Sequence, residues 1–328
     1  MVTTLVVIER NADTLTPQSL EALTAARELG AVDAVLLVDA DGAEALLPQL
    51  GDFGVGRLLL PRSDGTNPAD YFVGPAVDAL SAIVTGTDGY DAVLLAATFE
   101  GREIAARLAV RLDAAVVTDV ATLTVDEHGE IAVTKEVFAF TWTTTTTAPG
   151  RPPLIITLRA GVYAAAAAPV PETTRLERPG FALHSTATRL VSRRGDDVAS
   201  TGRPDVATSR IVVSAGRGTR GDLSAVEALA DALGGAVGGS RVAVDSGWLP
   251  HAAQVGQTGS VITPELYVAA GISGAIQHRA GMQTAHQIVV VNSDPQAPLF
   301  EIADFGVVGD LFAVLPRAAE LVRRHRAG

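Results

Sequence analysis

The sequence contains no cysteine among its 328 residues. Disulfides, thiolate metal sites and thiol nucleophiles are therefore excluded, and the composition fits a reducing compartment. Any redox chemistry of this chain needs a bound cofactor.

Basic charge is scarce as well, with 25 Lys and Arg against 37 Asp and Glu and a formal net charge of −12. A protein that binds nucleic acid neutralises phosphates with a basic surface, and this sequence shows no basic stripe. We therefore expect no nucleic acid partner.

Long hydrophobic runs are missing too. The longest run, GVYAAAAAPV at 161–170, is interrupted by proline, and it falls short of the ~20 residues that span a bilayer. The opening MVTTLVVIER has the pattern of a strand rather than of an export signal. We expect no membrane insertion and a cytoplasmic location.

The residues that are abundant indicate an α/β protein, since 48% are hydrophobic and 19% charged. Apolar runs at 5–8, 34–38, 57–60 and 92–97 alternate with segments of helical period, which is typical of mostly parallel sheets flanked by helices. One such helix is predicted over 19–30, with Ser19 as its N-cap and Gly30 at its end. Another is predicted over 101–113, and successive strands are predicted from there to residue 158.

The length exceeds what one hydrophobic core supports, so two domains are expected. Proline, charge and small residues gather from about residue 166 onward, and a second α/β pattern starts at 210–215. We predict an N-terminal α/β domain over 1–200 without a cofactor and a C-terminal domain over 201–328. In the second domain we predict a helix with a capping box at Ser224 and Glu227, and strands at 241–245, 265–272 and 287–292.

The segment GRGTRG at 216–221 follows a predicted strand and precedes a helix, as in dinucleotide-binding turns. It leaves open an NAD(P)-dependent oxidoreductase, with Arg217 or Arg220 directed toward a 2′-phosphate. The six histidines form no recognisable hydride-transfer motif. We therefore expect neither catalytic residues nor a metal site, and whether the chain is an enzyme stays open.

Residues 238–282 carry the most specific signal. The motifs, in chain order, are SRVAVDSG (240–247), QVGQTG (254–259), PELY (264–267), GISGAIQH (271–278), AGM (280–282), NSDPQAP (292–298) and ADFGVVGDLF (303–312). Together they closely resemble the FAD-binding domain of the electron transfer flavoprotein alpha subunit. The resemblance is close over 210–322, and in the first domain it rests on the layout and on GREIAARLA at 101–109.

The resemblance implies a Rossmann-like FAD-binding second domain. A flavin ring carries out the redox step itself, so the protein has only to hold and bias it. Thr258 is expected to hydrogen-bond flavin N5, Arg241 to lie against the ring and His278 to stabilise its reduced form near O2. The residues implied to bind the cofactor are Arg217, Ser240, Arg241, Gln254, Val255, Gly256, Gln257, Thr258, Gly259, Ser273, Gly274, Ala275, Ile276, Gln277, His278, Asn292, Asp310 and Leu311.

The resemblance further implies a heterodimer with a beta subunit that holds AMP, the first domain contacting this partner. Electrons would come from flavin dehydrogenases such as acyl-CoA dehydrogenases, in fatty acid β-oxidation, and pass to a membrane quinone oxidoreductase. The sequence departs from the family pattern at Ser260, where a basic residue is usual, and at TWTTTTT (141–147).

Overall fold

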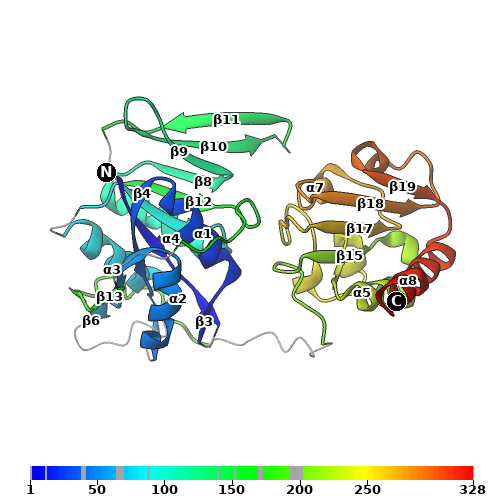
Figure 1. The fold of residues 1–328 in the computed structure, drawn as a ribbon, viewed down its shortest axis with the longest axis horizontal. Coiled ribbons are helices and arrows are strands. Elements are labelled where there is room, and N and C mark those ends of the chain that lie inside the picture. Colours follow the sequence, from blue (N-terminus) through cyan, green and yellow to red (C-terminus); the bar gives the residue numbers. More distant parts are fainter. Residues whose placement is uncertain are drawn as a thin grey trace. The chain divides into compact units, whose positions relative to one another are not determined.

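The computed structural model describes residues 2–11, 13–37, 42–63, 70–86, 89–138, 140–150, 153–168, 173–192 and 202–327. The chain separates into two compact units, Met1–Arg194 and Gly195–Gly328 (Figure 1). The predicted division at residue 200 lies outside the described residues. Within the described ranges, no helix is long and apolar enough to cross a membrane.

The first unit is built on a parallel sheet of seven strands, in the order β13-β5-β4-β1-β7-β12-β8. Its central strands are buried on both faces, which explains their nearly continuous apolar sequences. The strands are β1 (Val2–Val7), β4 (Gly30–Val35), β5 (Val55–Leu59), β7 (Ala92–Ala96), β8 (Val116–Val120), β12 (Leu154–Leu158) and β13 (Arg175–Glu177).

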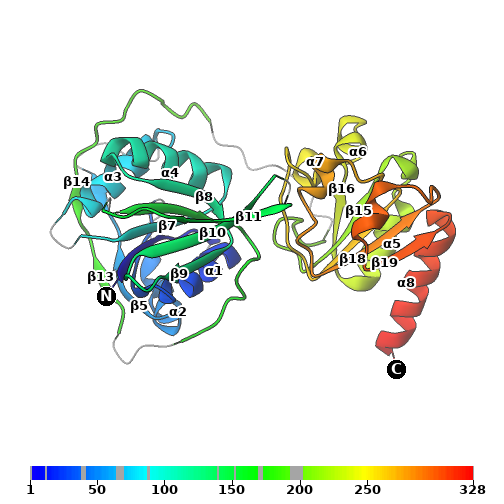
Figure 2. The same ribbon diagram turned by 90° about the horizontal axis from the view of Figure 1, so that it is seen from above.

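Helices cover both faces of this sheet (Figure 2). Leu23 of α1 (Pro17–Arg27) and Leu50 of α2 (Leu47–Asp52) belong to the core on one face. Leu80 of α3 (Gly74–Val84) and Leu108 of α4 (Phe99–Leu112) belong to the core on the other. The mostly parallel, helix-flanked sheet predicted for this half is confirmed.

The predicted cap of the first helix is wrong. Thr16 is the N-cap, and its hydroxyl accepts from the Ser19 amide at 3.3 Å. The Ser19 hydroxyl instead binds the backbone of Glu9, donating to its carbonyl at 3.0 Å. The helix ends at Arg27 rather than Gly30, which begins β4.

A separate antiparallel sheet follows α4. It contains β9 (Thr122–Val125), β10 (Ile131–Val137) and the fully exposed β11 (Trp142–Thr147), which confirms these predicted strands. Smaller elements complete the unit: β2 (Arg10–Asn11), β3 (Thr14–Leu15), β6 (Arg62–Ser63), β14 (Gly180–Phe181) and the 3₁₀ turn η1 (Ala43–Leu46).

The second unit has a parallel sheet of five strands in the order β16-β15-β17-β18-β19. The chain builds outward from β15 first to one side and then to the other, so β15 and β17 flank a topological switch point, where doubly wound sheets bind ligands. The strands are β15 (Ile211–Ala215), β16 (Ala236–Gly239), β17 (Leu266–Ala270), β18 (Gln287–Asn292) and β19 (Phe305–Val308).

Helices α5 (Ser224–Leu233) and α8 (Leu311–Ala327) pack on one face of this sheet. The short helices α6 (Arg241–Asp245) and α7 (Ile276–Arg279) and the 3₁₀ turns η3 (Arg217–Thr219), η4 (His251–Ala253) and η5 (Pro298–Ile302) lie in the connections.

Two local predictions fail in the second unit. The apolar run at 241–245 is the helix α6 and not a strand, because the Ser240 hydroxyl accepts from the Ala243 amide at 3.4 Å and starts a helical turn. The capping box is absent, since Leu223 occupies the N-cap of α5. The Ser224 amide donates instead to the Asp222 carboxylate at 3.0 Å.

Asp78 fastens a long connection onto α3 of the first unit. Asp78 is 3% exposed, and its carboxylate accepts from the His184 and Ser185 amides at 2.8 and 2.7 Å. Arg111 pairs with it at 2.9 Å. Burial raises the pKa of this carboxyl, but the hydrogen bonds and Arg111 outweigh burial and lower the pKa below its usual 3.8.

Asp78→Asn should therefore lower the local free energy of opening of α3 by about 1–3 kcal/mol at neutral pH. A carboxyl with a lowered folded-state pKa stabilises above its unfolded pKa, and its contribution disappears as the pH falls through the folded pKa. The difference from wild type should thus shrink below pH 3.8. Hydrogen exchange of the α3 amides measures this difference in opening free energy, and Asp113→Asn, a substitution at an exposed position, is the control. A pH-independent difference would show that charge is not the cause.

Candidate functional site

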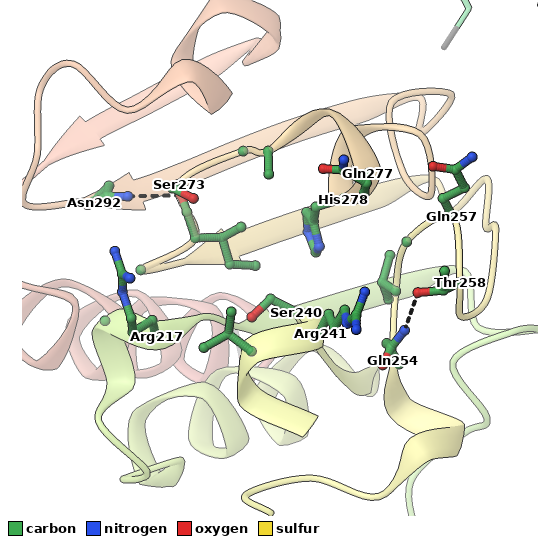
Figure 3. A pocket seen from close by; sticks show the side chains of 18 of the residues that line it. Arg217, Ser240, Arg241, Gln254, Gln257, Thr258, Ser273, Gln277, His278 and Asn292 are labelled. Atoms are coloured by element: carbon green, nitrogen blue, oxygen red, sulfur yellow. Dashed lines mark hydrogen bonds between the residues drawn. The ribbon is translucent and has the colours of Figure 1, made fainter. Parts of the chain in front are cut away.

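A cavity of about 430 Å³ lies at the carboxyl ends of the strands in the second unit. Its walls come from the connections that follow β15, β16, β17 and β18 (Figure 3). This is the switch-point edge at which doubly wound sheets bind ligands. Its volume is typical of small-molecule sites.

Most of the predicted binding residues line this cavity: Arg217, Ser240, Arg241, Gln254, Val255, Gly256, Gln257, Thr258, Ser273, Gly274, Ala275, Gln277, His278 and Asn292. They come from four loops far apart in the sequence. The motifs thus meet at one place in the fold, which the sequence motifs alone do not show.

Four predicted residues lie outside the lining. Gly259 packs behind the turn, where a Cβ would stand 2.3 Å from the Gln254 carbonyl oxygen. Ile276 is 66% exposed, and Leu311 is a core residue of the α8 face. The Asp310 carboxylate accepts from the Phe312 amide at 3.0 Å, so it caps α8, as a residue preceding a helix often does.

The lining also includes residues of the quoted motifs that were not among the predicted binding residues: Gly218, Val242, Gly271, Ile272 and Asp294. Gly271 and Ile272 directly follow β17, and the strand end itself was the available signal. Val242 belongs to α6, which was predicted as a strand, so the sequence could not indicate that the Val242 side chain lines the cavity.

Glycines bring the loops after β15 and β17 into backbone contact. The Gly218 amide donates to the Gly271 carbonyl at 3.0 Å. Gly271 has a φ of +65°, and a Cβ there would lie 2.7 Å from the Gly218 Cα. Only glycine fits at such an approach. This contact shapes the cavity between β15 and β17.

The cavity has two cationic side chains. Arg217 lies exposed in the turn after β15, and Arg241 begins α6. The Arg241 guanidinium pairs with Asp245 at 3.2 Å, yet its side chain stays 69% exposed. An exposed pair of this kind is weak, so Arg241 can turn toward an anionic ligand at little cost.

Asn292 ties two loops together. Its side-chain amide donates to the Ile272 carbonyl at 2.9 Å (Figure 3). Its side-chain oxygen accepts from the Asp294 amide at 3.1 Å. Asn292 thereby holds the connection after β17 against the end of β18. Ser273 and Gly274, on this connection, precede α7, which spans only Ile276–Arg279. Such a short helix has little macrodipole, so an anion there would depend on individual amides.

His278 is the most deeply placed titratable side chain of the site. It is 7% exposed, and its Nε2 lies 2.9 Å from the phenol oxygen of the buried Tyr267. Its buried Nδ1 has no hydrogen-bond partner among the described residues. Burial lowers the pKa of His278 to about 4. The ring is therefore neutral at pH 7 and offers no positive charge to a bound ligand.

These features suit an FAD. Arg217 can meet phosphates, the glycine contact allows close backbone approach, and Thr258 offers a hydroxyl to a planar heterocycle. The fold and site thus define a doubly wound flavin-binding unit joined to a second α/β unit.

Comparison with known proteins identifies the family. The model of the electron transfer flavoprotein domain matches residues 4–179, and that of the electron transfer flavoprotein FAD-binding domain matches 205–283. The electron transfer flavoprotein subunit alpha of Mycobacterium leprae is 42% identical over 99% of this chain and its own full length. That of Syntrophomonas wolfei is 38% identical over 96% of this chain and 98% of its own. The mitochondrial electron transfer flavoprotein subunit alpha of Arabidopsis thaliana is 32% identical over 97% of this chain and 89% of its own length.

The chain belongs to the alpha subunits of the electron transfer flavoprotein family. It is an electron carrier with FAD as its cofactor, and it works as a heterodimer with a beta subunit. The resemblance found in the sequence motifs is thus confirmed.

The burial of His278 generates a test. A histidine with a lowered pKa contributes stability above its unfolded pKa of 6.5, and that contribution declines as the pH falls toward the folded value of about 4. We expect ¹⁵N NMR to show a neutral imidazole down to about pH 4, with the exposed His128 as internal reference. Protonation near 6.5 would contradict the buried position.

Proposed function

We propose that this chain accepts electrons from flavin dehydrogenases, such as acyl-CoA dehydrogenases of fatty acid β-oxidation, and passes them through its FAD to a membrane quinone oxidoreductase. The observation that carries the proposal is the cavity at the switch point of the second unit, where the motif residues meet. FAD supplies the redox chemistry when bound, and the chain's residues hold and orient it.

Arg217, Ser273, Gly274, Ala275 and Asn292 would hold the adenosine and phosphate part. They line the side of the cavity formed by the loops after β15, β17 and β18, where backbone amides and a guanidinium favour negative charge.

The flavin ring would lie against the opposite side, near Arg241, the 254–258 loop and His278. Arg241 would favour a negatively charged reduced ring, since opposite charges attract more strongly when water is excluded. Gln257 and Gln277 would contact the ring or the ribityl chain with their amides.

The first unit would contact the beta subunit, which we expect to hold AMP. Support comes from large apolar side chains that the first unit exposes: Phe99 and Phe138 are each 80% exposed, and Trp142 is 69% exposed. Exposed aromatic residues are enriched at protein interfaces. We place the heterodimer in the cytoplasm.

The rival function is an NAD(P)-dependent oxidoreductase that uses the turn at 216–221. This turn does line the cavity through Arg217 and Gly218. Arg220, however, lies outside the lining with a φ of +53°, so only Arg217 is placed to meet a ligand phosphate. Arg217 would serve either ligand, and FAD is favoured by the match to the FAD-binding family domain.

A reduction assay separates the two functions. The co-purified heterodimer should be yellow, and a catalytic amount of acyl-CoA dehydrogenase with its substrate should bleach the flavin. NADH or NADPH alone should not bleach it, and omission of the dehydrogenase is the control. A colourless heterodimer that binds NADPH would refute the proposal, whereas a yellow one that this dehydrogenase cannot reduce would refute only the donor.

A further inference from the structure

Gln254 is an unusually buried polar side chain of the cavity wall, only 3% exposed. Its backbone is fixed on both sides, because its amide donates to the His251 carbonyl at 2.9 Å and its carbonyl accepts from the Ser260 amide at 2.7 Å. A bridge to Gly239 also ties it to the end of β16. Its side chain is therefore held in place.

The side-chain amide of Gln254 has one described partner in the cavity. Its Nε2 donates to Thr258 Oγ1 at 3.0 Å (Figure 3). An amide nitrogen can only donate, while a hydroxyl has one hydrogen and two acceptor sites. Thr258 thus accepts from Gln254 and keeps its own hydrogen for a different partner.

That partner must come from the cavity side. The Thr258 side chain is exposed and lines the cavity, whereas Gln254 lies buried behind it. The hydroxyl is consequently presented to a ligand as a hydrogen-bond donor. If the group at position 254 were an acceptor, the hydroxyl would donate inward and turn a lone pair to the ligand.

We propose that Gln254 is a positioning residue that sets the Thr258 hydroxyl as a donor toward flavin N5 and thereby opposes proton uptake at that nitrogen. This inference rests on the proposed position of the ring beside Thr258. N5 accepts a hydrogen bond while it is unprotonated and donates one once it carries a proton. A fixed donor therefore favours the unprotonated nitrogen, and the carrier can gain an electron without a proton.

The buried amide in this turn has a physical role. A surface turn would be satisfied by water, but a buried Gln254 amide needs a protein partner. Its partner is the one hydroxyl of the 254–259 segment, so the hydrogen bond that stabilises the turn also fixes the direction of Thr258.

Gln254→Glu reverses this direction with nearly the same shape, because a carboxylate only accepts. The readout is the first-electron reduction potential of FAD in the heterodimer as a function of pH. Wild type should show a nearly flat profile. Gln254→Glu should steepen this profile toward the slope expected when one proton is taken up with each electron. Each pH unit then changes the reduction equilibrium tenfold, which shifts the potential by about 59 mV.

Two controls separate direction from charge. In a Thr258→Val background, Gln254→Glu keeps its charge but should lose its effect on the slope, since the hydroxyl through which it acts is gone. Gln254→Met removes the donor without charge and should give an intermediate slope.

The outcomes distinguish this inference from the proposed site. An equal slope change with and without the Thr258 hydroxyl, or none in either Gln254 variant, would overturn the positioning role. Loss of FAD from both Gln254 variants would overturn it too, because Gln254 would then support binding itself. If Thr258→Val alone changed neither potential nor slope, the ring would not lie at Thr258, and the proposed site would fail.

Discussion

The second unit depends on one backbone contact, that between Gly218 and Gly271. It joins the loop after β15 to the loop after β17, through an amide-to-carbonyl hydrogen bond of 3.0 Å. Leu311 of α8 packs behind it, 3.0 Å from where a Gly271 Cβ would stand. Leu311 thus belongs to the site only as support. With the two loops held together, the remaining motifs line the cavity between them.

In the proposed function, the polar residues of the cavity bias a bound ring. His278 is kept neutral by burial and is held by Tyr267. Thr258 is oriented by Gln254. Arg241 supplies charge from an exposed, weakly paired position. These are the functions that a protein performs for a cofactor which carries the chemistry itself, and they agree with an electron carrier.

Much of this architecture was predictable from the sequence. The buried parallel strands have long apolar runs, and the motif segments fall at strand ends. Single-turn details were not predictable. The run at 241–245 has an apolar pattern that suits a strand, but the Ser240 cap makes it a helix. Ser19 looks like a cap, yet tertiary packing engages it with Glu9. The direction of the Gln254 amide depends on a neighbour that only the folded turn provides.

The central claim is that the glycine contact at the switch point creates the FAD site. The most direct measurement is the FAD content of the purified heterodimer after dialysis, for Gly271→Ala and for Gly247→Ala. Both positions have a left-handed φ, +65° and +75°, but a Cβ at Gly247 meets nothing within 4 Å, while one at Gly271 meets Gly218. The backbone strain is thus matched. We predict that Gly271→Ala weakens FAD binding about tenfold or more, equivalent to ~1.4 kcal/mol, and that Gly247→Ala retains FAD. Equal retention by both variants would contradict the account.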